Sequence, residues 1–143
     1  MADKQPGEYG YRDTSFRTMG GEAGIRRLVD RFYDLMRDDP RAAAVRAMHP
    51  QDLSLSREKL AAFLCGWLGG PKLYRERWGP IYIPPAHAHL NVTQREHDEW
   101  LWCMDQAVDT MSVPQDFKDY FKREIRVPAG RVLKLCQQRA AEQ

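Results

Sequence analysis

The chain has 143 residues, of which 43% are hydrophobic and 29% charged, and it carries a formal net charge of +2 at pH 7. This length suits one domain with one core, and the composition excludes both a disordered chain and the strongly basic surface of a nucleic-acid-binding protein. No apolar run approaches the ~18–20 residues that a membrane helix needs, and the polar first residues contain no secretory apolar segment. We therefore expect a cytoplasmic protein without a nucleic-acid or membrane partner.

The amino-terminal third contains one strongly amphipathic segment. We interpret residues 1–15 as a polar extension, for which the sequence predicts no regular structure, and residues 16–143 as the domain. From Ile25 to Met36 apolar residues recur mostly at steps of three and four, which predicts a helix that begins at the glycine pair 20–21 and ends before Pro40. Proline disfavours helix at the residue before it, so His49 lies at a corner of the chain.

The middle of the chain predicts a second helix and then an irregular segment. Residues suited to capping stand near positions 52–56, an apolar stripe follows, and Gly69-Gly70-Pro71 ends the helix. A short helical piece fits residues 73–78. Prolines then interrupt the chain so closely that residues 79–92 must form a loop with at most a turn or two of helix.

Two further helices complete the prediction. Thr93 and Glu96 have the spacing of a capping box and open the third helix, and the last helix begins after Pro114, with Pro128 and Gly130 expected to kink it. No segment alternates with period two for long enough to indicate a strand. The fold class is therefore all-α, with four main helices.

The three cysteines, Cys65, Cys103 and Cys136, are widely spaced and flanked by apolar residues. Their odd number and spacing argue against a disulfide framework and against a cysteine-rich zinc site. We expect them to be small buried residues.

The irregular segment carries His87 and His89 among apolar residues, and a loop of this length in a compact domain commonly has a function. Three other groups combine bulk with a hydrogen-bonding atom: Tyr33 on the first helix, His49 at the corner and Trp100 on the third helix. Each of these alone is most often an ordinary core or surface residue. Together they suit a pocket that holds one metal-bound polar ligand.

These residues resemble a known family, the group II truncated haemoglobins of bacteria and plants. The resemblance spans roughly residues 19–137 and rests on GGEAGIRRLVDRFYDLM (residues 20–36), MHPQDLSLSREKLAAFLCGWLGGPKLY (residues 48–74) and DEWLWCMDQAV (residues 98–108). The paired glycines, the Phe32-Tyr33 pair and the Trp100-Leu101 pair keep the family's order and spacing. The resemblance implies a two-over-two helical sandwich around haem b, with a shortened proximal helix.

The resemblance also implies roles for individual residues. His87 lies thirteen residues before Trp100, where the family places the proximal histidine that binds haem iron, and His89 does not. Tyr33, His49 and Trp100 match the positions that surround an iron-bound ligand and are expected to donate hydrogen bonds to it. Other residues expected to contact the cofactor are Ser56 at the distal gate, Leu60 one turn on, Phe63, Lys72, Tyr74, Leu90 and Met104.

Around the proximal histidine the sequence departs from the family. The usual arginine-rich pattern is replaced by Pro84-Pro85-Ala86 before His87 and by Ala88-His89-Leu90 after it. The candidates to meet the haem propionates are therefore Lys72, Tyr74, Arg75 and His89, and Leu90 stands in place of a phenylalanine that covers the porphyrin.

The function that the resemblance implies is reversible binding of O2 and other small ligands such as NO, CO or peroxide. Donors in a dry pocket slow ligand release, which favours sensing, storage or redox chemistry over transport. Peroxidase-like or NO dioxygenase-like turnover would need an external reductase, because the chain has no flavin or dinucleotide motif. The sequence does not choose between a monomer and a homodimer.

Two other interpretations stay open at this stage. The domain could be a haem-free helical interaction or sensor domain, because the arginines near His87 are missing. It could also bind zinc through His87 and His89 with His49 or His97, although zinc normally takes three or four ligands and no acidic or thiolate partner is obviously spaced to complete the site.

Overall fold

The computed structural model describes residues 4–81 and 90–142, and the predicted iron ligand His87, together with His89, lies outside these residues. The described helices are α1 (Thr14–Thr18), α2 (Gly21–Asp38), the short 3-10 helix η1 (Pro40–Ala42), α3 (Ala43–Ala47), α4 (Ser54–Trp67), α5 (Leu73–Trp78), α7 (Gln94–Asp109) and α8 (Gln115–Ala141). No strand occurs in the described ranges, which confirms the all-α prediction.

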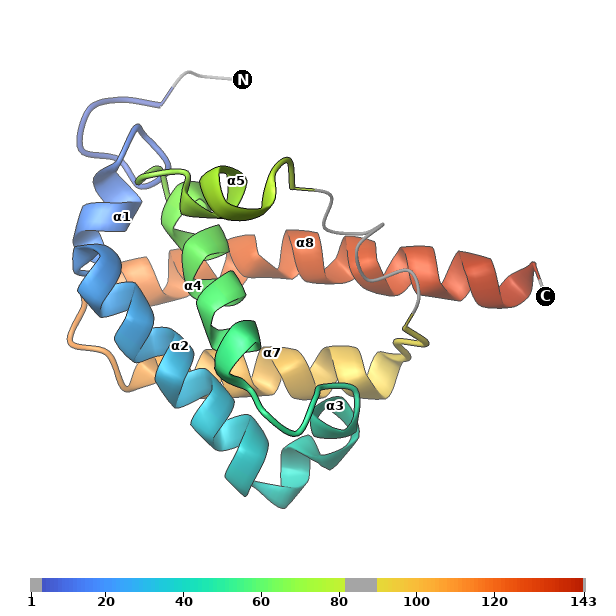
Figure 1. Cartoon of the computed structure of the whole chain (residues 1–143). Helices are drawn as coiled ribbons and strands as arrows, with labels where there is room; N and C mark the ends of the chain where they lie inside the picture. Colours follow the sequence, from blue (N-terminus) through green and yellow to red (C-terminus); the bar gives the residue numbers. More distant parts are fainter. Residues whose placement is uncertain (1–3, 82–89, 143) are drawn as a thin grey trace.

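The four long helices form two layers. In Figure 1, α2 and α4 lie over α7 and α8; α3 joins α2 to α4 beside α7, and α5 follows α4 at the other end of that helix. Phe32 on α2, Leu64 on α4, Met104 on α7 and Phe121 on α8 are all fully buried in the shared core. Each helix thus faces its apolar stripe toward the others, and the arrangement is the predicted two-over-two helical sandwich.

The ends of the helices follow the sequence signals closely. Helix α2 begins after Gly20, which has a φ of 101°, a backbone conformation that glycine adopts with little strain. Helix α7 begins with the predicted capping box of Thr93 and Glu96. Helix α8 continues through Pro128 and Gly130 without interruption. Cys65, Cys103 and Cys136 are buried thiols, as predicted.

The extension before the domain packs onto α8. The ring of Tyr9 lies 5.0 Å from that of Phe117, and the Tyr9 hydroxyl donates a hydrogen bond of 2.9 Å to Asp116. Residues 14–18 form α1, where Ser15 is buried and accepts a hydrogen bond from the amide of Gly10. Part of the extension therefore contacts the core, although its composition is polar.

Ion pairs join α2 to α4 across the first layer. Arg26 donates to Glu58 at 3.0 Å, and Arg57 donates to Asp34 at 2.9 Å and to Asp30 at 3.2 Å. Such partly exposed pairs each contribute at most about 1 kcal/mol. Their main effect here is to position Arg57. The guanidinium carbon of Arg57 lies above the ring of Tyr33, 5.7 Å from the ring centroid.

Two helical glycines should respond oppositely to alanine. A Cβ at Gly24 would overlap the backbone carbonyl oxygen of Met19, which cannot move away, whereas a Cβ at Gly130 would meet nothing within 4 Å. We expect Gly24→Ala to lower the free energy of unfolding by at least about 2 kcal/mol and Gly130→Ala to raise it by about 1 kcal/mol. Urea unfolding of both variants measures the difference, and equal effects would contradict this packing of α2 against residue 19.

Candidate functional site

A cavity of about 440 Å³ lies between the two layers, lined by residues from α2, α3, α4, α5, α7 and α8 and from the chain on both sides of residues 82–89. Eight of the residues that sequence reasoning selected line it: Tyr33, His49, Ser56, Leu60, Phe63, Tyr74, Leu90 and Trp100. Two others do not, because Lys72 is exposed at the residue before α5 and Met104 points into the core with no exposed surface. Arg75 is exposed and likewise outside the lining.

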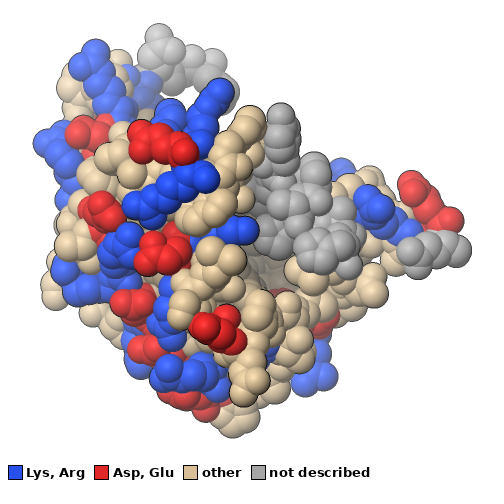
Figure 2. Space-filling model, in the orientation of Figure 1, with Lys and Arg blue, Asp and Glu red and all other residues tan. Residues whose placement is uncertain are grey.

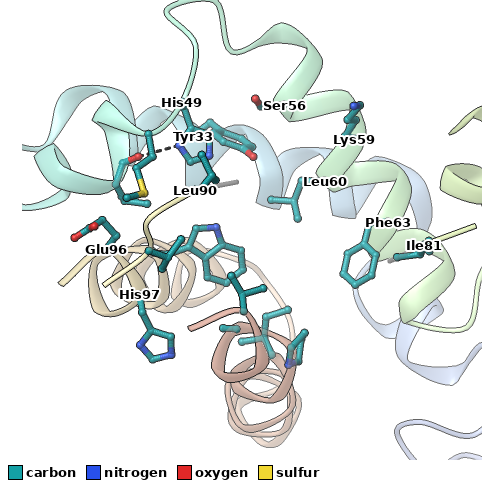
Figure 3. Close-up of a pocket in the computed structure, with 18 of the residues that line it drawn as sticks. Tyr33, His49, Ser56, Lys59, Leu60, Phe63, Ile81, Leu90, Glu96 and His97 are labelled. Atoms are coloured by element: carbon teal, nitrogen blue, oxygen red, sulfur yellow. Dashed lines mark hydrogen bonds between the residues drawn. The ribbon is translucent and has the colours of Figure 1, made fainter. Parts of the chain in front are cut away.

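The cavity is polar at one end and apolar at the other. Figure 3 shows Tyr33 and His49 beside each other near Ser56, with Leu60 in the middle and Phe63 and Ile81 at the far end. The rings of Tyr33 and His49 meet edge to face at 5.9 Å between centroids. The structure thus brings together a phenol from α2 and an imidazole from the corner after α3, which lie sixteen residues apart in sequence.

Phe32 holds the polar end in place from behind. Its ring lies edge to face against Tyr33 at 4.8 Å and against Trp100 at 5.1 Å, and it is fully buried. The same side chain therefore fixes the positions of a residue from α2 and one from α7. This is why the Phe32-Tyr33 pair works as a unit, with one residue in the core and the next at the cavity.

Tyr33 is a well-protected hydrogen-bond donor. Only 5% of its surface is exposed, and burial raises the pKa of its phenol well above the ordinary value, with a smaller opposing effect from the charge of Arg57. A raised pKa keeps the phenol protonated at every physiological pH. Tyr33 can therefore donate its proton to a ligand in the cavity.

His49 differs from Tyr33 in the hydrogen bonds that its ring can offer to a ligand. Its Nδ1 atom lies 2.9 Å from the carbonyl oxygen of Val45, and because a carbonyl can only accept, Nδ1 carries a proton. In the neutral ring Nε2 then carries none and can only accept. The sequence-based interpretation treats His49 as a donor, whereas this geometry limits donation through Nε2 to the protonated ring.

The corner that presents His49 is held by side chains on both sides. Glu99 of α7 accepts a hydrogen bond of 2.9 Å from the amide of Val45. Arg46 donates to the carbonyl oxygens of Pro50 and Gln51 at 2.9 and 3.0 Å. Backbone groups that helix α3 leaves without partners are thus satisfied, which fixes the corner.

Sequence reasoning missed one wall of the cavity. Ile125, Pro128, Ala129 and Val132 of α8 line it, and their spacing places them on one face of a helix. The same periodicity was visible in the sequence, yet it shows only that the face is buried and not what it faces.

Three further polar residues that sequence reasoning did not assign to the haem pocket line the cavity; it considered His97 only as a zinc ligand in the alternative interpretation. Lys59 lies in the cavity wall one residue before Leu60, with its ammonium 5.8 Å from the ring of Trp78. Glu96 and His97 line the cavity at the start of α7, where Thr93 donates its hydroxyl to Glu96 at 2.7 Å. Glu96 was predicted as part of a cap, and capping and cavity lining prove compatible.

The charged side chains of the described surface are mixed in sign on the face shown in Figure 2. Figure 2 shows acidic and basic side chains interleaved over the face it presents, without a continuous patch of either sign. Among residues 4–81 and 90–142, no group of three or more histidine, cysteine or acidic side chains could hold a metal ion. No helix in that part of the chain is long and apolar enough to cross a membrane.

The raised pKa of Tyr33 predicts a pH dependence of stability. The unfolded chain releases the phenol proton near pH 10, while the folded chain retains it, so the stability due to the buried phenol is present below about pH 10 and is lost as pH rises above it. We expect Tyr33→Phe to reduce this alkaline loss by up to about 1.4 kcal/mol per pH unit. Urea unfolding between neutral pH and pH 11 measures it, with Tyr11→Phe as control, and parallel curves for Tyr33→Phe and the unaltered chain would contradict it.

Comparison with known proteins places the chain in a family. The bacterial-like globin family matches residues 14–130. The chain is 29% identical over 109 residues to group 2 truncated hemoglobin YjbI of Bacillus subtilis strain 168, covering 76% of this chain and 80% of that protein.

Solved structures agree in fold. The group II 2-on-2 hemoglobin of the plant pathogen Agrobacterium tumefaciens is 32% identical, with a TM-score of 0.80 over 92% of this chain and 97% of that one. The truncated oxygen-avid haemoglobin of Bacillus subtilis is 27% identical, with a TM-score of 0.76 over 83% of this chain and 98% of that one. Together with the two-layer fold, these matches show that the chain belongs to the bacterial-like globins and, among them, to the group II truncated haemoglobins.

Proposed function

We propose that the chain binds haem b in the cavity between its two layers, with His87 as the iron ligand, and that it binds O2 and related small ligands reversibly beside Tyr33. The observation that carries this proposal is the cavity itself, which has one polar end and otherwise mostly apolar walls. Its volume of about 440 Å³ falls among those of small-molecule and cofactor sites. Family membership supports haem as the occupant.

The position of His87 in the sequence also supports its role as the iron ligand. Ile81 and Leu90, which flank residues 82–89, both line the cavity. The two described ends of the segment that carries His87 are therefore both at the cavity, nine residues apart in sequence. A neutral imidazole from this segment is the kind of ligand that globin iron takes.

The residues present fit the cofactor's edges and faces. Leu60, Phe63 and Leu90 would contact an apolar ring system from α4 and from the chain before α7, and the α8 wall adds Ile125 and Val132. A propionate needs a cation or a polar group, and Lys59 and Tyr74 supply these at the cavity. Lys59 thus takes the role that the sequence suggested for Lys72 and Arg75, which lie outside the lining.

Bound haem would supply the metal that takes up a diatomic ligand and transfers electron density to it. The chain's own contribution is to hold donors at the polar end and to keep water out. Tyr33 offers its phenol proton at any physiological pH, and Trp100 can offer only its indole proton. Neutral His49 accepts, so it suits a ligand that itself carries a proton.

Strong donation in a dry cavity favours slow ligand release over bulk O2 transport. The similar haemoglobin from Bacillus subtilis is described as oxygen-avid. Sensing, storage or redox chemistry on O2, NO or peroxide therefore fits the site better, and redox turnover would draw electrons from a separate reductase.

The first test is cofactor binding. Titration of the protein with hemin should produce a Soret band with one hemin per chain, because the cavity is preformed. His87→Ala should abolish the band or alter it strongly by removing the iron ligand, whereas His89→Ala should retain it. Absence of a Soret band from a folded chain, judged by circular dichroism, would support a haem-free interaction or sensor domain instead.

The second test concerns the polar end. Tyr33→Phe removes one hydrogen-bond donor without changing the ring, so O2 dissociation from the ferrous protein should accelerate roughly ten-fold. Stopped-flow displacement of O2 by CO measures the rate. Tyr11→Phe, the same chemical change outside the cavity, is the matched control, and equal rates in both variants would remove Tyr33 as the ligand's donor.

A further inference from the structure

The carboxyl-terminal part of helix α8 lies beyond the residues that the family match covers. The family match ends at residue 130, but α8 continues to Ala141. Figure 1 shows this part of α8 running past the beginning of α7. A helix end that projects beyond the core would ordinarily expose all its faces.

This part of α8 is nevertheless buried along one face. Leu133 and Cys136 are only 8% and 6% exposed, while Arg131, Lys134 and Gln137 between and beside them are exposed. Val132 lines the cavity on the same stretch of helix. The face that Leu133 and Cys136 share is therefore covered by other parts of the chain.

A hydrogen bond identifies one contact on that face. The thiol of Cys136 donates to the carbonyl oxygen of Leu90 at 3.3 Å. Leu90 precedes α7 and lies outside any regular element, so its carbonyl needs a partner from elsewhere when it is partly buried. A thiol is a weak donor, but a bond shielded from water is stronger than the same bond in solution.

We propose that Cys136 is a positioning residue: its bond to Leu90 fixes one end of the segment that carries His87 against the cavity. Leu90 follows His87 by three residues and itself lines the cavity. Extended chain spans at most about 3.6 Å per residue, so fixing Leu90 confines where the imidazole of His87 can lie. The carboxyl-terminal part of α8 thus supports a proximal segment that lacks the family's arginines.

The inference rests on the proposed haem site, and two variants of one residue test it. Cys136→Ala removes the donor, and Cys136→Ser keeps a hydroxyl donor in its place. Loss of hemin to excess apomyoglobin should be roughly two- to five-fold faster in Cys136→Ala than in the unaltered protein, and Cys136→Ser should restore at least half of the difference. The iron–histidine stretch in the resonance Raman spectrum of the ferrous protein should shift in Cys136→Ala alone.

Cys103→Ala is the matched control. Cys103 lies on α7 and is fully buried in the hydrophobic core, so the substitution leaves a void of the same size. Equal acceleration of hemin loss in Cys136→Ala and Cys103→Ala, with no shift of the stretch, would reduce Cys136 to an ordinary packing residue and overturn the proposal. Equal hemin loss in all variants would overturn it as well.

A measurement without hemin separates this inference from the haem proposal. In the hemin-free protein, amide hydrogen exchange in peptides covering residues 82–92 should be faster for Cys136→Ala than for Cys136→Ser. If no variant binds hemin, the haem proposal fails while this comparison still decides whether Cys136 holds Leu90. Identical exchange in the two variants would overturn the role of Cys136.

Discussion

The site depends on keeping a phenol buried and protonated at the end of a mostly apolar cavity. Tyr33 is 5% exposed and meets the rings of Phe32 and His49. These two rings and the guanidinium of Arg57 above its face hold the phenol ring in one position. The same burial that raises its pKa makes it a donor that pH does not switch off, and this constancy distinguishes it from the neighbouring imidazole.

Much of the fold could be predicted from the sequence because local signals dominate it. The end of α4 at Gly69-Gly70-Pro71 and the capping box at Thr93 are decided within a few residues, and the periodicity from Ile25 to Met36 is decided within α2. The site was predicted only in part. Periodicity shows that Met104 and Val132 are both buried, but it cannot show that Met104 faces the core and Val132 the cavity. Which way each of these side chains faces depends on packing between helices that are far apart in the sequence. The same packing decides that Lys59, and not Lys72, lines the cavity.

The tautomer of His49 was beyond sequence reasoning for a similar reason. A histidine at a helix corner suggests a proton donor or acceptor, and only the position of the Val45 carbonyl decides which nitrogen carries the proton. The corner is in turn fixed by Glu99 from α7 and by Arg46. The chemistry of one ring atom therefore depends on a contact between α3 and α7 that no local pattern encodes.

The two sides of the cavity are built on different principles. The side of Tyr33 rests on long helices with strong periodicity, and its residues keep the family's order. Ile81 and Leu90, the described residues on either side of a segment with two prolines, line the cavity but lie outside regular structure. Proline removes conformations from the unfolded chain and so lowers the entropy lost on ordering such a segment. Under our proposal such a segment still needs an anchor, and α8 provides one through the bond of Cys136 to Leu90, which gives a use to the buried face that Leu133 and Cys136 share.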